Sequence, residues 1–126
     1  MCEAMPEAAL DLPADLSAAR EARAFVRARL CPQHGSELLE RALLVVSELA
    51  VNAVEHGEPP VRAGVDCRSG VLHLEVSDGS AVPPRVSAPG PEAESGRGVN
   101  LVQTVCSAWG VRPEPAGKTV WCDLPA

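Results

Sequence analysis

The stretch SELAVNAVEHG, residues 47–57, decides how the whole chain is interpreted. It closes a longer segment, residues 36–56, that is apolar over most of its circumference when drawn as a helix. Such a helix is buried against a sheet or other helices. Ser36 is expected to cap its start, and Gly57 to follow its last residue.

Within this helix, polar residues recur at every fourth position: Glu48, Asn52 and His56. Steps of four keep side chains near one helix face, with a drift of about 40° per step. Burying a polar group without a partner costs about 1–3 kcal/mol, so this stripe faces either water or a ligand. The spacing alone favours neither, because the solvent edge of an amphipathic helix explains it as well as a binding site does.

The segments on either side of this helix predict a mixed fold. Residues 16–30 hold helix formers with apolar residues at helical spacing, and Asp15 or Ser17 can cap their start. After Pro60 the apolar period becomes that of half-buried strands. A further helix is expected over residues 99–109, and strands are expected over residues 9–13, 61–67, 71–77, 109–112 and 118–124.

This order of elements predicts a single α+β domain over residues 1–126. We expect a two-layer α/β sandwich in which a mixed, mainly antiparallel sheet carries about three helices on one face. Residues 1–8 are expected to form a loose N-terminus. Residues 79–97 are rich in proline and glycine and lack any period, which is usual for a functional loop or lid.

Composition excludes several classes of function. The chain has 11 Lys and Arg against 17 Asp and Glu, a net charge of −6, two Trp and one Phe. It therefore lacks the basic surface and the stacking aromatics of most nucleic-acid binders. No apolar run approaches the roughly 20 residues of a membrane span. The acidic start is unlike a signal peptide, so we expect a cytoplasmic protein without nucleic-acid or membrane partners.

The chain has five cysteines, none of them in a CxxC pair: Cys2, Cys31, Cys67, Cys106 and Cys122. A zinc site would need clustered Cys or His, and the three histidines do not supply it. We therefore expect reduced thiols, several of them buried, as is usual in the cytosol.

A second candidate site lies where the strand over residues 71–77 ends. Asp78 follows this strand and precedes Gly79. A carboxylate at this point could accept a hydrogen bond from an exocyclic amine, and the glycine would let a flat ring approach the backbone. Viewed alone, the pair is more simply explained as an ordinary Asp-Gly turn.

A third candidate site is the sequence Gly96-Arg97-Gly98, directly before the helix predicted at residues 99–109. A helix start offers free N–H groups and the positive end of the dipole, which favour phosphate. Arg97 could add charge-assisted contacts. The alternative is a loop hinge with a surface arginine.

Residues 117–119, GKT, do not form a P-loop. That motif needs a glycine five residues before the Gly-Lys pair, where this chain has Arg112, and it needs a helix afterwards. A strand is expected here instead. Gly117 and Lys118 are expected to form a hairpin turn, with Lys118 near the site.

In this order and spacing, the motifs resemble those of the GHKL ATPases, the superfamily of DNA gyrase, heat-shock chaperones and histidine kinases. The resemblance covers residues 9–124 and rests on Glu-x-x-x-Asn-Ala-x-x-His, Ser-Asp-Gly, Gly-Arg-Gly and the final GKTVW. The short length and the closing WGV…GKTVWCDL look like the anti-sigma-factor serine/threonine kinases. The resemblance implies the Bergerat ATP-binding fold.

The resemblance also implies a role for each candidate residue. Asn52 would bind the Mg²⁺ that bridges the ATP phosphates, and Glu48 would act as general base. Asp78 would receive the adenine amino group, and His56 would be a structural or rim residue at the helix end. The rest of the nucleotide-binding set comes from the loop and the last strand: Gly79, Ser80, Gly96, Arg97, Gly98, Lys118 and Thr119. Ser80 departs from the superfamily pattern, which has glycine there.

Two functions follow from the resemblance. The first is an ATP- and Mg²⁺-dependent serine/threonine kinase that phosphorylates an antagonist protein of the STAS type and captures a sigma factor, as a homodimer. The alternative is a non-catalytic regulatory module that binds such a partner with weak or vestigial nucleotide binding. Ser80 and the short loop, with only Arg85 and Arg97, favour this alternative. A plain globular domain with polar surface stripes would explain none of the joint spacing.

Overall fold

The computed structural model describes residues 5–30, 35–68, 70–82 and 105–125. Two helices and five strands lie within this part, in the order β1 (Met5–Leu12), α1 (Ala18–Arg29), α2 (Gly35–His56), β2 (Val61–Arg68), β3 (Val71–Asp78), β4 (Ala108–Glu114) and β5 (Gly117–Pro125). The predicted α+β class is therefore confirmed.

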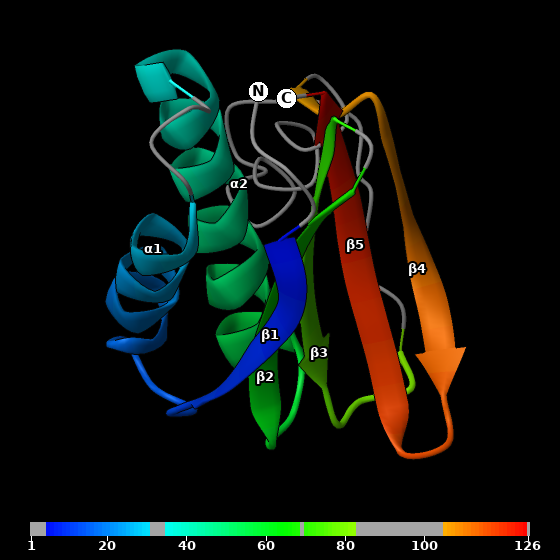
Figure 1. Ribbon diagram of the computed structural model, residues 1–126. Coiled ribbons are helices and arrows are strands. Elements are labelled where there is room, and N and C mark those ends of the chain that lie inside the picture. The colour runs from blue at the N-terminus through cyan, green and yellow to red at the C-terminus, as the bar shows by residue number, and fades with distance from the viewer. Residues whose placement is uncertain (1–4, 31–34, 69, 83–104, 126) are drawn as a thin grey trace, which may run out of the picture.

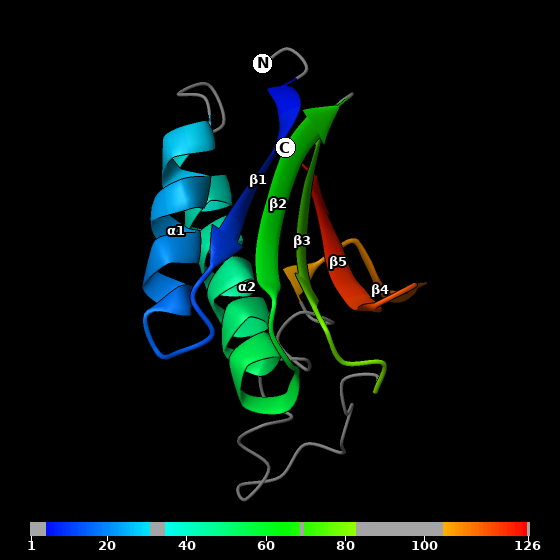
Figure 2. The ribbon, with the colours of Figure 1, turned by 90° about the horizontal axis from the view of Figure 1, so that it is seen from below.

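The five strands form one sheet in the order β1-β2-β3-β5-β4, and each neighbouring pair is antiparallel. Both helices cover the same face of this sheet, so the described part has two layers (Figures 1 and 2). α2 packs mainly across β3, and α1 packs against α2 and β1. The expected sandwich is confirmed, with an antiparallel rather than a mixed sheet in the described part.

The core between the two layers is made chiefly of Val, Leu and Ala, as the scarcity of aromatic residues predicts. α2 contributes one continuous buried stripe: Leu38, Ala42, Val45, Val46, Leu49, Ala50 and Ala53. This stripe fixes the rotation of α2 about its axis, because seven apolar side chains leave water together. Neither of the described helices is long and apolar enough to cross a membrane.

Side chains of β3 and β5 alternate between the two faces of the sheet, as the strand period requires. We call the face toward the helices the inner face. It carries the buried residues Leu72, Leu74, Val76, Asp78, Lys118, Val120, Cys122 and Leu124. We call the opposite face the outer face. On these two strands it carries His73, Glu75, Ser77, Thr119, Trp121 and Asp123.

The starts of three elements refine or correct the expectations. β1 begins at Met5, inside the expected loose end, because pairing with β2 resumes beyond an irregularity between Met5 and Ala8. α1 starts after an Asp15 turn in which Oδ1 accepts the Ser17 N–H at 2.8 Å. α2 begins at Gly35, which has a φ of 82°, so Ser36 lies inside the first turn and does not precede the helix as a cap.

The third predicted helix falls mostly outside the described residues, which resume at residue 105. Its predicted end is wrong, because β4 already begins at Ala108. The N–H and the hydroxyl of Ser107 both donate to the backbone carbonyl of Asp123, at 2.9 and 3.0 Å. These two hydrogen bonds join the chain to β5 one residue before β4 begins.

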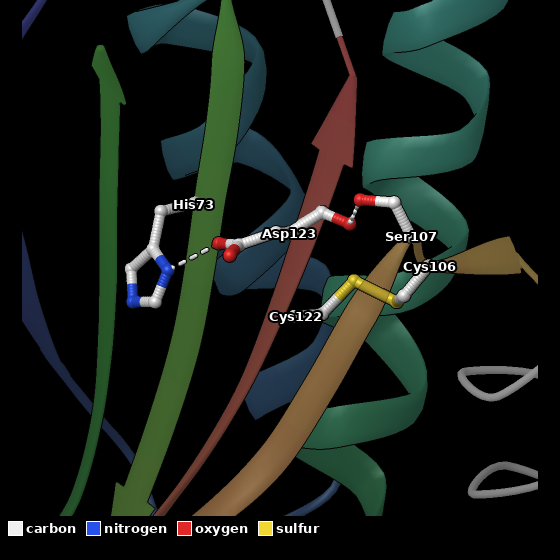
Figure 3. The surroundings of a disulfide bond; sticks show 5 residues. All are labelled: His73, Cys106, Ser107, Cys122 and Asp123. Atoms are coloured by element: carbon white, nitrogen blue, oxygen red, sulfur yellow. Dashed lines mark hydrogen bonds and ion pairs between the residues drawn. A yellow bond between two sulfur atoms is a disulfide. The ribbon is translucent and has the colours of Figure 1, made fainter.

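The expectation of reduced thiols is wrong for two of the five cysteines. Cys106 and Cys122 form a disulfide, with Cα atoms 5.8 Å apart. Figure 3 shows Cys122 leaving β5 toward Cys106, while its neighbour Asp123 points to His73. The pairing of β4 with β5 brings the two cysteines together across 16 positions of sequence. A search for CxxC spacing cannot find such a pair.

Candidate functional site

The carboxyl group of Asp78 lies on the inner face where β3 ends. The residue is 6% exposed. Its Oδ1 accepts two hydrogen bonds, from Nζ of Lys118 at 3.0 Å and from the backbone N–H of Ser80 at 2.8 Å. The register of β3 and β5 places Asp78 opposite Lys118. A carboxylate that accepts two donors on one oxygen is held in a single orientation.

The lysine that pairs with Asp78 is itself buried, at 5% exposure, which is rare for this residue type. Its ammonium group also donates to the backbone carbonyl of Ser80 at 3.5 Å. The Ser80 hydroxyl accepts the N–H of Val82 at 3.2 Å. Ser80, which departs from the superfamily pattern, therefore belongs to the turn that orients Asp78 and Lys118.

The C-terminal end of α2 lies against the same carboxyl group. A Cβ added to Gly57 would collide with Cγ of Asp78 and would lie 2.6 Å from Oδ2. Gly57 does follow the last residue of α2, and its N–H bonds to the Ala53 carbonyl at 3.0 Å. It is not among the described glycines with positive φ, so it is no left-handed cap. Glycine is needed here because a side chain would displace the carboxyl group.

Gly79 allows a close approach, but the described neighbour is backbone. Its N–H donates to the Glu58 carbonyl at 2.6 Å, and an added Cβ would lie 2.5 Å from the Pro59 carbonyl oxygen. The connection between α2 and β2 therefore holds the end of β3 in place. This joins Asp78 firmly to the helix that carries Glu48 and Asn52.

Asn52 lies on the side of α2 away from α1, and Glu48 lies between that side and α1. The residues of α2 that line a shallow groove against α1 include Val51 and Val54. At about 100° per residue, Asn52 points well away from Val51 and Val54, whereas Glu48 shares a helix face with Glu55, which also lines the groove. Both are partly buried, and the side-chain nitrogen of Asn52 is buried without a hydrogen-bond partner among the described residues.

Arg41 extends the same stripe toward the start of α2, seven residues before Glu48. Its Nε is also buried without a described partner, although Nη2 lies 3.4 Å from Glu37. Within the described part, Asn52 and Arg41 carry the two buried side-chain polar atoms that lack partners. An unsatisfied buried group costs about 1–3 kcal/mol. The stripe is therefore partly buried, and a bound water, a ligand or a group outside the described residues is needed to satisfy these two atoms.

Two other predicted positions, His56 and Thr119, stand apart from this site, and three lie outside the described residues. His56 is exposed at the end of α2, and its Nε2 lies 3.7 Å from Glu55. Thr119 faces outward, and its hydroxyl donates to Glu114 at 3.1 Å. Gly96, Arg97 and Gly98 lie outside the described residues. The structure thus brings Asp78, Ser80 and Lys118 into contact beside the end of α2, and it does not bring Thr119 to them.

A polar cluster on the outer face was not expected from the sequence. His73 bonds through Nδ1 to Asp123 at 2.6 Å and through Nε2 to Glu75 at 2.9 Å, and its ring stacks on Trp121. The hydrogen bond to Glu75, together with the contact with Asp123, raises the pKa of His73 to about 9. Burial of the ring acts in the opposite direction but is outweighed. The hydrogen bond from His73 in turn lowers the pKa of Glu75. Arg112 joins the cluster through Glu75 at 3.4 Å.

Comparison with known proteins places this architecture in a family. A family model for the histidine kinase-like ATPase domain matches residues 12–123. No curated protein matches the chain. Among solved structures, the RsbU and RsbW domains of Rv1364c from Mycobacterium tuberculosis share the fold, with a TM-score of 0.71 and 20% identity. That match covers 95% of this chain and 32% of the other, so this chain spans about a third of it. The chain belongs to the histidine kinase-like ATPase family, as its motifs predicted.

Proposed function

We propose that this protein is a regulator of the anti-sigma-factor type, which binds ATP with Mg²⁺ and phosphorylates a serine or threonine of an antagonist protein of the STAS type. The buried, oriented carboxyl group of Asp78 carries the proposal. It packs against Gly57, the residue that follows the helix bearing Glu48 and Asn52. Family membership implies ATP binding. The likeness to a structure that contains an RsbW domain supports the regulatory role.

The side chain of Asn52 fits a ligand of Mg²⁺. Asn52 has a buried amide without a described partner, and rotation of the amide exchanges its oxygen and nitrogen. Mg²⁺ prefers oxygen ligands, takes few of them from protein and neutralises phosphate charge during phosphoryl transfer. Asn52 would hold this ion. Glu48, about 6 Å earlier along the helix axis, would orient and deprotonate the attacking hydroxyl.

Titration calorimetry and phosphotransfer test the two halves of this proposal. With MgATP, we expect binding to wild type, and binding at least about tenfold weaker to Asn52→Ala, since a charge-assisted contact is worth about 1.5–3 kcal/mol. With labelled ATP and STAS-type antagonists, we expect Glu48→Gln to bind ATP and fail to transfer phosphate. Glu55→Gln, an exposed carboxylate on the same helix, is the matched control. Equal ATP affinity in Asn52→Ala would remove the metal role.

A non-catalytic binding module is the second candidate, and one observation favours it. Oδ1 of Asp78 is already paired with Lys118 and with the Ser80 N–H, so an incoming base meets an occupied oxygen. If this candidate is right, the protein forms a stable complex with a sigma factor or an antagonist that MgATP leaves unchanged. It then transfers no label to any of them, even where calorimetry shows ATP binding.

A further inference from the structure

Among the described residues, the buried Lys118 has acceptors for two of the three protons on its ammonium group. An ammonium group carries three protons. Two of them have acceptors among the described residues, Oδ1 of Asp78 at 3.0 Å and the Ser80 carbonyl at 3.5 Å. The side chain is 6% exposed, so water has little access to the third proton. A buried proton without an acceptor is costly, and the ammonium group that carries this third proton lies beside the carboxylate that the proposed function assigns to the base.

Within the described part of the chain, Asp78 has the complementary feature, a carboxylate oxygen that accepts no hydrogen bond. Both donors to its carboxyl group reach Oδ1, and among the described residues none reaches Oδ2. Gly57 packs directly against this carboxyl group, because an added Cβ would collide with Cγ and lie 2.6 Å from Oδ2, so only a glycine here leaves the carboxyl group undisturbed. The end of β3 and the start of β5 thus present an acceptor and a donor side by side, both fixed by buried contacts.

Adenine offers the matching pair of groups on one edge. Its exocyclic amine donates, and the adjacent ring nitrogen N1 accepts. We propose that Lys118 is a specificity-determining residue that donates its third proton to N1 of adenine while Asp78 accepts from the amine. This inference rests on the proposed ATP binding and adds to it a direct contact from the protein to the ring nitrogen. The carboxylate alone would not distinguish adenine from other bases that carry an amine at the same position.

Nucleotide analogues test this contact on the wild-type chain. Replacing N1 by CH in 1-deaza-ATP removes the acceptor and leaves the amine in place. A hydrogen bond to a charged group corresponds to about a 10- to 100-fold change in affinity. We therefore expect 1-deaza-ATP to bind that much more weakly than ATP in calorimetry. The control, 7-deaza-ATP, loses a ring nitrogen on the other side of the base and should bind like ATP.

A variant connects the effect to Lys118. Lys118→Met removes the donor and keeps the length of the side chain, so its affinities for ATP and 1-deaza-ATP should become equal. Its ratio of ATP to ADP affinity should match that of wild type, because the contact is to the base. A changed ratio would assign Lys118 to the phosphates and overturn the inference. If this variant does not fold, the wild-type comparison of the two analogues decides alone.

The possible failures are distinguishable. Equal binding of ATP and 1-deaza-ATP to wild type would leave Lys118 as a structural counter-ion of Asp78, with ATP binding intact. Guanine carries an acceptor where adenine has its amine and a donor where adenine has N1. Tighter binding of GTP than of ATP would mean that Asp78 and Lys118 contact this reversed pattern, and it would also overturn the inference. Absence of binding to any adenine nucleotide would contradict the proposed function itself.

Discussion

Two ion pairs join β3 to β5, one on each face of the sheet. On the inner face, Lys118 and Asp78 lie 3.0 Å apart with side chains 6% and 3% exposed. On the outer face, His73 and Asp123 lie 2.6 Å apart with side chains 28% and 29% exposed. The same two strands therefore hold similar contacts in different surroundings, and access to water is what separates them.

This difference assigns different physical roles to the two pairs. A buried pair has lost its hydration, so removal of one partner leaves a costly lone charge. A partly exposed pair is screened by water and contributes less to stability than a buried one, but its histidine remains free to titrate. The inner pair is therefore expected to order the site, whereas the outer pair is expected to make the stability of the sheet sensitive to pH.

Removing the inner lysine should produce the largest effect. Lys118→Met leaves the carboxylate of Asp78 buried without its counter-charge, and breaking such a pair costs about 3–5 kcal/mol. Urea unfolding measures this change as a shift of the midpoint, provided that the m-value stays the same in wild type and variant. The double variant Lys118→Met/Asp78→Asn removes the lone charge, and it should recover part of the loss.

The matched control lies on the outer face. Arg112→Met also removes a cation from a contact with a carboxylate of β3, but Arg112 is 50% exposed. We expect a loss of about 1 kcal/mol or less. Equal losses for Lys118→Met and Arg112→Met would contradict the comparison, because burial would then not govern the strength of these pairs.

Removal of the disulfide should cause the next largest loss of stability. This bond lies on the inner face of β5. Closing a loop of about 15 residues stabilises the folded state by about 3 kcal/mol in the chain-entropy view, and this one spans 16 positions. Cys106→Ser should lower the free energy of unfolding by that order. A reductant should lower the free energy of unfolding of wild type to that of Cys106→Ser, and it should leave the stability of Cys106→Ser unchanged. Stability of wild type that does not respond to reductant would count against the bond.

Gly57→Ala should have a smaller effect, with Gly64→Ala as its counterpart across the sheet. At Gly57, the new methyl meets Cγ and Oδ2 of Asp78 and the Ala53 carbonyl, all of them fixed by buried contacts. Overpacking of this kind costs about 1–3 kcal/mol. At Gly64, the methyl meets the Glu75 side chain at 3.1 Å, which can move toward water. Calorimetry should show weaker ATP binding for Gly57→Ala, whereas Gly64→Ala should bind ATP like wild type.

The sequence predicted most of the fold because its signals there are local. Apolar period and the glycine after His56 placed α2 to within one residue at each end, and alternation placed β2 and β3 equally well. β1 was predicted too short, because its pairing with β2 is irregular near Met5. A strand that deviates from regular pairing leaves a weaker pattern in the sequence.

The contacts of the candidate site were less predictable, because they depend on register. Asp78 was a candidate base-binding group through the family resemblance, but its contact with Lys118 requires the pairing of β3 with β5. Gly57 was interpreted only as a helix stop, although its role is to leave space for a carboxyl group 21 positions later. The Cys106–Cys122 bond depends on the same kind of non-local pairing. Alternation along β5 could have shown that Lys118 and Thr119 face opposite ways.

The outer pair, His73 and Asp123, should make the stability of the protein depend on pH. The pKa of His73 rises from 6.5 to about 9 in the folded protein, first through its hydrogen bond to Glu75 and further through Asp123. A raised folded pKa means that the contribution to stability is complete below pH 6.5 and is lost as pH rises through about 9. After allowance for screening, we expect about 1–2 kcal/mol. Denaturation of wild type and His73→Gln at pH 6 and at pH 9.5 measures it, and the two stabilities should converge at the higher pH. A difference that stays constant would mean that His73 acts through its stacking on Trp121 and not through its charge.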